Sequence, residues 1–343
     1  MAATGTEITA AVKKAAAWGT AVAVGASDGI LLTRDAITKR RGVEVDESAG
    51  QAFAREADRG NIVVGGDLTA WARYDGLATL LALAMGTAGA PTQQEATAAY
   101  KHILQLATNT DGKFATYVRD LDTQIQECPS LKVLGFDLAG EAGQPCTLTF
   151  PTAADDLLLP AVTNTSVASV TYRDRGNRIL FSQAVFRCNA QGGAALGSGD
   201  VIKPASFRLA CRLPLTGDYL AGNADKIAEP VRDGPRLPEI TLTLQFPQFS
   251  SASWNTAFQA DARQKLDIIF TGGLIEGAYH YSLVIPCPHV VVEESTQEIP
   301  GAGKIPNPVT LRLLEAAAAP TGMTYTAPIT LELINRQTTN PLG

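Results

Sequence analysis

The chain has 343 residues, 45% of them hydrophobic and 18% charged, and a formal net charge of −6. This composition supports a sizeable buried core and excludes a globally disordered protein, and the length fits two domains better than one. Without a long basic block, the acidic balance gives no reason to expect tight nucleic-acid binding.

A short apolar stretch follows two lysines near the start. Lys13 and Lys14 precede "AAAWGTAVAVGA", which faintly resembles a signal peptide. The stretch is rich in alanine and glycine rather than leucine, which favours an exposed N-terminal arm over residues 1–16. The longest strongly apolar run, "LATLLALAMG", is shorter than the roughly 20 residues that cross a bilayer, so no membrane partner is expected.

The first half then shows a β-rich pattern with one helix. "ILLTRDAITKR" and "NIVVGGDL" favour strands, and the charged stretch between them predicts a long loop or an extended hairpin. "DLTAWARYDGLATLLALAMG" has a helical period, with Asp67 or Thr69 as the cap, Trp71 early in the helix and Gly86 at its end. Turn clusters then separate four predicted strands, "YKHILQL", "KFATYVRDL", "PSLKVLGFDLAG" and "QPCTLTFP".

The second half repeats this order after a polar connection over residues 156–178 with room for a short helix. Strands, a second long charged loop at residues 216–238 and the strand "EITLTLQF" precede a Ser-capped helix with Trp254 early in it. Five more strands follow, and each half carries a Cys-Pro before an apolar strand, "CPSLKVLGF" and "CPHVVVEES". The pattern predicts a degenerate duplication of a mainly β module over residues 17–155 and 179–337, with a C-terminal tail at residues 338–343.

One motif suggests catalysis. Gly25-Ala26-Ser27-Asp28-Gly29 matches the Gly-x-Ser-x-Gly elbow of serine hydrolases. Only 26 residues precede Ser27, a strand-like run follows it, and the three histidines sit in strand-like segments. An elbow needs a sheet before it and a helix after it, so we interpret the segment as a turn and expect no catalytic residue.

Other site signals are weaker still. Asp155 and Asp156 are adjacent and would point to different sides, so they predict no carboxylate dyad. The odd number of widely spaced cysteines and the absence of Cys-x-x-Cys predict free, mostly buried thiols made in a reducing cytoplasm. We therefore expect no metal and no cofactor.

Several segments resemble a known family. "AWGTAVAVGASDGILLTRD", the helix segment and the strands that follow up to residue 155 are similar to the tail tube proteins of long-tailed, siphovirus-type phages. The resemblance implies two tandem tail-tube-like β-sandwich or barrel domains, each with one flanking α-helix and a long charged loop. It further implies a structural, non-enzymatic virion protein, assembled in the host cytoplasm, whose rings stack into a hollow conduit for DNA ejection.

The resemblance also implies partners. The chain would bind copies of itself, in a three-chain ring with pseudo-six-fold symmetry or alternatively in a hexamer. The stacked tube would meet a tape measure protein, a tail terminator and tail tip proteins, and double-stranded DNA would pass through its lumen without specific binding. Other readings are a different tail or capsid component, such as a terminator or decoration protein, a ligand-binding β-sandwich, and, last, a serine hydrolase acting through Ser27.

The two charged loops are the candidate contacts between rings. Each is longer than the roughly 12–15 residues at which structureless loops become uncommon, and each mixes charge signs, which suits a complementary partner surface. The predicted contact residues are Lys39, Arg40, Arg41, Glu44, Asp46, Glu47, Asp225, Lys226, Glu229, Arg232 and Asp233. Trp71 and Trp254 are the predicted anchors of the two helices.

Overall fold

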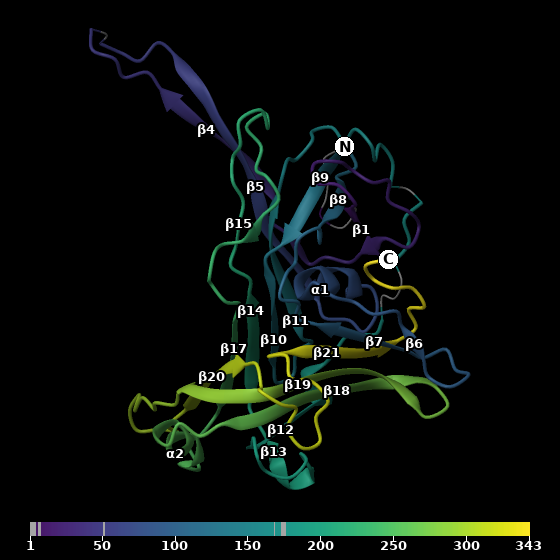
Figure 1. Ribbon diagram of the computed structural model, residues 1–343, viewed down its shortest axis with the longest axis vertical. Coiled ribbons are helices and arrows are strands. Elements are labelled where there is room, and N and C mark those ends of the chain that lie inside the picture. The colour runs from purple at the N-terminus through teal and green to yellow at the C-terminus, as the bar shows by residue number, and fades with distance from the viewer. Residues whose placement is uncertain (1–4, 6–7, 51, 168, 173–175) are drawn as a thin grey trace.

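The computed structural model describes residues 5, 8–50, 52–167, 169–172 and 176–343 (Figure 1). The fold is mainly β, as the sequence predicts. Nineteen strands join one bent, antiparallel sheet system, and a small two-stranded sheet lies beside it. The described part of the chain contains two α-helices.

The elements of the first half are β1 (Thr9–Lys14), β2 (Gly29–Ile30), β3 (Arg34–Asp35), β4 (Thr38–Val45), β5 (Ala57–Trp71), α1 (Ala78–Met85), β6 (Thr92–Gln93), β7 (Tyr100–Gln105), β8 (Ala115–Asp120), β9 (Ile125–Val133), β10 (Gly135–Glu141) and β11 (Thr147–Ala154). Those of the second half are η1 (Phe181–Gln183), β12 (Ala184–Ala190), η2 (Ser198–Asp200), β13 (Val201–Ile202), β14 (Ser206–Arg212), β15 (Leu215–Thr216), β16 (Val231–Arg232), β17 (Glu239–Phe246), α2 (Ser253–Gln259), β18 (Gln264–Glu276), β19 (Tyr279–Glu294), β20 (Asn307–Leu314) and β21 (Thr330–Asn335).

The two halves share one strand order. In the first half the pairing runs β1–β8–β9–β11–β5–β4. In the second half it runs β12–β18–β19–β20–β17–β14. In each half the helix follows the fifth strand of this order, β5 or β17, in the sequence. Each half therefore contains the same order of six paired strands.

The two Cys-Pro pairs mark the same irregularity in both modules. The register shifts between Tyr117↔Cys128 and Ala115↔Leu131, and again between Leu266↔Cys287 and Gln264↔Val290. Each shift is a β-bulge that places one extra residue on the strand containing the proline. Proline has no N–H for the sheet ladder, so a bulge is a position where it is tolerated.

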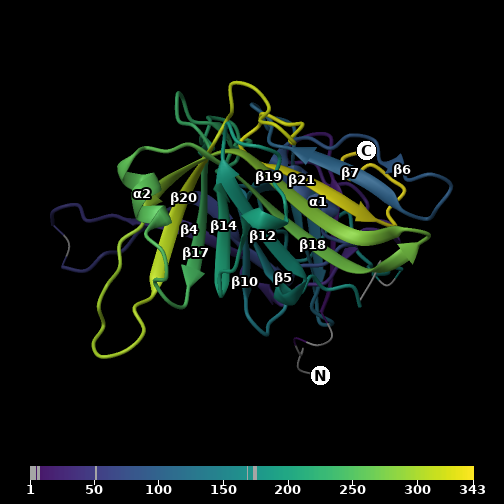
Figure 2. The ribbon, with the colours of Figure 1, turned by 90° about the horizontal axis from the view of Figure 1, so that it is seen from below.

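The halves are joined by strand pairing and by a common core. β10 of the first half pairs with β14 of the second, and β7 pairs with β21. Buried side chains of both halves belong to one hydrophobic cluster, with Phe136 and Leu138 from β10 and Leu209 and Cys211 from β14. Figure 2 shows strands of both halves side by side, from β20 through β17 and β14 to β5.

The helices differ from the prediction in length and in anchoring. α1 begins at Ala78 and not near Asp67, because residues 57–71 continue as strand β5. Trp71 is consequently a half-buried strand residue opposite Thr147, outside helix α1. Nearly every side chain of α1 is buried, and the helix ends at Gly86 in the left-handed conformation, as predicted. α2 lies at the edge of the molecule and holds Trp254, which is 8% exposed.

The start of the chain also differs from the prediction. Residues 9–14, expected in an exposed arm, form β1, which pairs with all six residues of β8. Ala10, Ala11 and Val12 are buried. The small side chains of Ala10, Ala11 and Val12 fit a tightly packed core strand.

Candidate functional site

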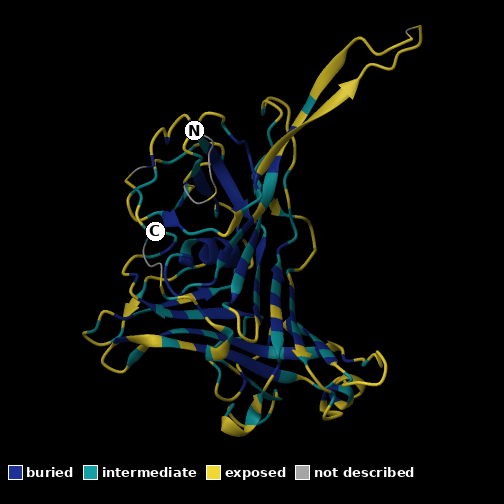
Figure 3. Cartoon of the chain, turned by 180° about the vertical axis from the view of Figure 1, so that it is seen from behind, coloured by how far each residue is buried: buried dark blue, intermediate teal, exposed yellow. Residues whose placement is uncertain are grey.

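A β-hairpin projects from the molecule. It consists of residues 38–59, from β4 through the turn into the start of β5, and we call it the β4–β5 hairpin. Every described residue of it is exposed (Figure 3), and it extends beyond the rest of the chain at the top of Figure 1. The first charged segment is therefore an extended hairpin, one of the two forms that the sequence predicts.

The hairpin combines charge with exposed apolar side chains. Its first strand carries Lys39, Arg40 and Arg41, and acidic residues follow toward the turn. Phe53 is 84% exposed, and Val43 is 65% exposed. A two-stranded hairpin is marginally stable alone, and large apolar side chains in water favour a partner surface. The hairpin is the most prominent candidate contact surface of the described chain.

The second charged loop folds back onto the base of this hairpin. The backbone N–H of Ile62 in β5 donates to the carbonyl oxygen of Asp225 at 2.8 Å, and the hydroxyl of Tyr219 donates to the Ile62 carbonyl at 2.9 Å. The Trp18 indole N–H donates to the carbonyl of Ile227 at 3.0 Å. This loop is thereby held by the first half of its own chain.

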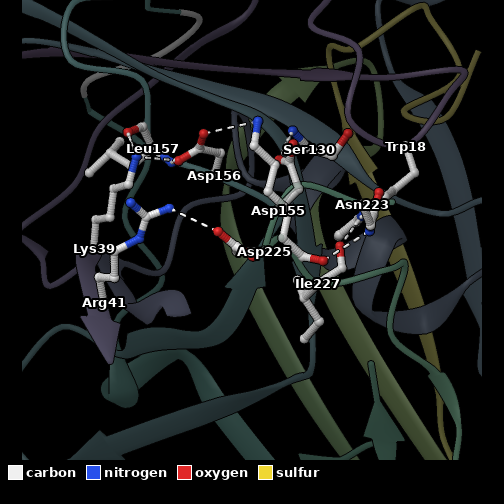
Figure 4. Close-up of polar contacts among 11 residues, drawn as sticks. Trp18, Lys39, Arg41, Ser130, Asp155, Asp156, Leu157, Asn223, Asp225 and Ile227 are labelled. Atoms are coloured by element: carbon white, nitrogen blue, oxygen red, sulfur yellow. Dashed lines mark hydrogen bonds and ion pairs between the residues drawn. The ribbon is translucent and has the colours of Figure 1, made fainter. Parts of the chain in front are cut away.

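Asp156 fastens the two charged segments together (Figure 4). Its carboxylate accepts from Lys39 of the hairpin at 2.6 Å and from Lys226 of the loop at 3.0 Å. Burial alone raises the pKa of the Asp156 carboxyl, but the hydrogen bonds from the two lysines outweigh it and hold the pKa below its usual value. Asp156 is therefore a charged link at the base of the hairpin.

The neighbouring Asp155 faces the other way, as the adjacency of the two carboxylates predicts. Its Oδ1 accepts the backbone N–H of Ser130 at 2.8 Å, and its Oδ2 is buried without a hydrogen-bond partner among the described residues. Burial raises the pKa of Asp155 to about 6, against the opposing effect of its backbone hydrogen bonds. The two carboxyls have different partners and form no dyad.

A buried lysine anchors the loop at a second point. Lys132 of β9 has a side chain with no exposure, and its Nζ lies 2.6 Å from the Glu229 carboxylate and 2.6 Å from the Thr110 carbonyl oxygen. Burial lowers the pKa of Lys132, while the hydrogen bond and charge of Glu229 counteract this. The Glu229 carboxylate offsets part of the desolvation cost of this buried ammonium.

The predicted contact residues thus fall into two groups. Lys39, Arg41, Asp225, Lys226 and Glu229 make ion pairs within the chain, Arg232 donates to the carbonyls of Arg236 and Thr108, and Asp233 pairs with Arg236. Arg40, Glu44, Asp46 and Glu47 lie on the exposed hairpin. Sequence reasoning missed Asp156, Lys132 and Trp18, whose partners Lys226, Glu229 and Ile227 lie 70, 97 and 209 residues away in the chain.

Ser27 lies in a turn. The Asp28 carboxylate accepts the backbone N–H of Gly25 at 2.6 Å, and the backbone N–H of Asp28 donates to the Gly25 carbonyl. A short strand, β2, follows where a hydrolase elbow requires a helix. The three histidines, His102, His280 and His289, each contact a backbone carbonyl oxygen. The described residues contain no cluster of potential metal ligands, and none of their helices is long and apolar enough to span a membrane.

The comparison with protein families agrees with this architecture. The profile of the family described as phage tail tube protein matches residues 5–327, which include all the strands from β1 to β20. The chain belongs to the phage tail tube protein family. A comparison with curated proteins gives no match. Membership assigns this tail tube protein a structural role in the virion tail and self-assembly into a tube.

Proposed function

We propose that rings of this tail tube protein stack into the hollow conduit through which phage DNA passes into the host. The observation that supports this most is the exposed β4–β5 hairpin on a chain of the tail tube family. The part of the hairpin beyond its base contacts the next ring and sets its register by charge complementarity, through Glu44, Asp46 and Glu47. It is free for this because the second loop holds only its base.

The two repeated modules, residues 17–155 and 179–337, act as two tube domains joined by residues 156–178. Three chains then supply six modules, which gives a ring with pseudo-six-fold symmetry. The matching strand orders support this count, because each module can occupy an equivalent place in the ring. The tube is built in the host cytoplasm, around a tape measure protein and between terminator and tip proteins, and it has no enzymatic activity.

Electron microscopy of the purified protein at raised concentration tests this function. We expect rings and stacked tubes of uniform width. A protein that stays dispersed as monomers at all concentrations, in the presence of its tail partners as well, would contradict it.

A further inference from the structure

The strand pairing between β10 and β14 joins the two halves of the chain, and each half also contains an incompletely paired segment equivalent to one of these two strands. In the first half, β10 pairs with β11 on one side and with β14 of the second half on the other. The pairing with β14 covers seven residue pairs, from Gly135↔Arg212 to Glu141↔Ser206. Asp137 of β10 accepts from Arg208 at 2.9 Å and from Arg212 at 2.5 Å across this pairing. Because the two halves share one strand order, the second half has a segment equivalent to β10 and the first half has one equivalent to β14.

Rows of directly opposed residues identify these equivalents. In the first half, one row crosses four strands as Lys132, Ala153, Gly65 and Thr38. In the second half, the matching row is Val291, Arg312, Thr241 and Ala210. Thr38 therefore corresponds to Ala210, and residues 34–40 correspond to β14. At the other end of the row, Val291 corresponds to Lys132. Thr296, five residues after Val291, therefore corresponds to Asp137, and residues 294–300 correspond to β10.

Residues 294–300 and 34–40 each lack, among the described residues, the neighbouring strand that β10 and β14 provide for one another. Within the part of the chain that the structure describes, residues 296–300 form no backbone–backbone hydrogen bond, and Ile299 is 76% exposed. β3 and β4 pair with β5 on one side and with no described strand on the other. The two segments lie at opposite edges of one continuous run of strands, β4–β5–β11–β10–β14–β17–β20, so they cannot meet as neighbours in this run within one chain.

We propose that residues 294–300 of one chain add as an antiparallel strand to residues 34–40 of a second copy, in the register of β10 on β14. This inference rests on the proposed ring, whose side-by-side contact it specifies. Thr296 then lies opposite Thr38, and Glu294 lies opposite Arg40. An unpaired edge strand is a template for such an addition, and a contact that joins unlike edges of identical chains closes into a ring when the rotation permits.

The charges of the two segments are complementary. Glu294 and Glu298 are exposed on the added segment, while Arg34 and Arg40 are exposed on the receiving edge. Lys39 and Arg41, beside Arg40, already pair with Asp156 and Asp225. In the proposed register Glu298 is diagonal to Arg34, as Asp137 is diagonal to Arg208 and Arg212 in the internal junction. Arg40 takes the place of Arg212. The interface between chains thus also sets acidic against basic side chains, with Thr296 in the place of Asp137 and Ala36 in the place of Arg208.

Disulfide trapping tests this register. In the Thr38→Cys, Thr296→Cys double variant the two Cα atoms would lie about 4.5–5.5 Å apart on neighbouring chains, within the range of a disulfide. Mild oxidation of assembled protein should give covalent species of two and then three chains on a non-reducing gel. The control is Thr38→Cys with Ile299→Cys, three residues out of register and on the other strand face, which should give no ladder above that of the single variants.

The outcomes separate this interface from the proposed function. Rings or tubes that assemble normally but show no cross-linking beyond the control would overturn the strand addition and leave the tube function standing. Absence of any ring or tube would overturn both. As a second readout, Arg40→Glu or Glu294→Arg alone should weaken ring formation about fivefold, and the combined swap should restore it. A combined swap as weak as the single variants would also count against this register.

Discussion

At the scale of residues, two adjacent carboxylates show how the fold assigns opposite roles to identical side chains. Asp155 is buried with one oxygen unpaired, whereas Asp156 is paired with two lysines. The sequence predicts that they point apart, but it contains no sign of which one is costly. That depends on Lys39 and Lys226, which are 117 and 70 residues away.

The two carboxylates should respond oppositely to replacement by asparagine. The folded pKa of Asp155 is about 6 and its reference value is 3.8, so above pH 6 the ionised form destabilises the fold by about 3 kcal/mol. Asp155→Asn should therefore raise the free energy of unfolding at pH 7–8 by up to about 3 kcal/mol, with the gain vanishing toward pH 4.

Asp156→Asn is the matched variant. The folded pKa of Asp156 is lowered, so its stabilisation is present above the unfolded pKa and is lost as the pH falls through the folded pKa. At pH 7 the replacement should cost about 1–3 kcal/mol. Urea unfolding at several pH values measures both variants, and destabilisation of equal size by the two at pH 8 would show that our description of the site is wrong.

A second residue-scale prediction concerns the loop anchor. Glu229→Ala leaves the ammonium of Lys132 buried and without its carboxylate, which should cost about 3–5 kcal/mol. Asp225→Ala, on the same loop, removes an exposed pair with Arg41 and should cost at most about 1 kcal/mol. Chemical denaturation of the two variants checks the contrast, and equal losses would mean that Glu229 is no more than a surface charge.

At the scale of elements, the sequence predicts strands better than their limits and contacts. The helix near Trp71 is placed too early, because the three- and four-residue spacing of apolar side chains extends back into β5, where sheet pairing with β11 decides the conformation. The strand "YKHILQL" is correctly predicted as β7, since a turn and a further strand follow it. The second charged loop looks like the first in composition, yet long-range contacts hold it against its own chain.

The hairpin should be dispensable for folding but required for stacking. All the described residues of 42–57 are exposed, so their deletion should change the thermal unfolding of the ring or monomer little. Electron microscopy should show rings or monomers but no long tubes. If the shortened protein still forms tubes of normal length and rise, the hairpin does not join rings.

At the scale of the whole molecule, one chain builds the same module twice and joins the copies through a strand pairing. The repeated strand order could be predicted from the order of strands, charged loop and helix in each half, and its division into two tube domains stays a prediction. The junction could not, because β10 and β14 are paired by tertiary packing and carry no local signal. The central claim is that the two modules of one chain fill two of six equivalent places in a ring.

The mass of a single isolated ring tests this claim most directly. Native mass spectrometry or mass photometry of rings of the hairpin-deleted protein, which should not stack, gives the number of chains per ring. We expect three chains per ring. Six chains in a single ring, with electron microscopy excluding a stacked pair, would contradict it.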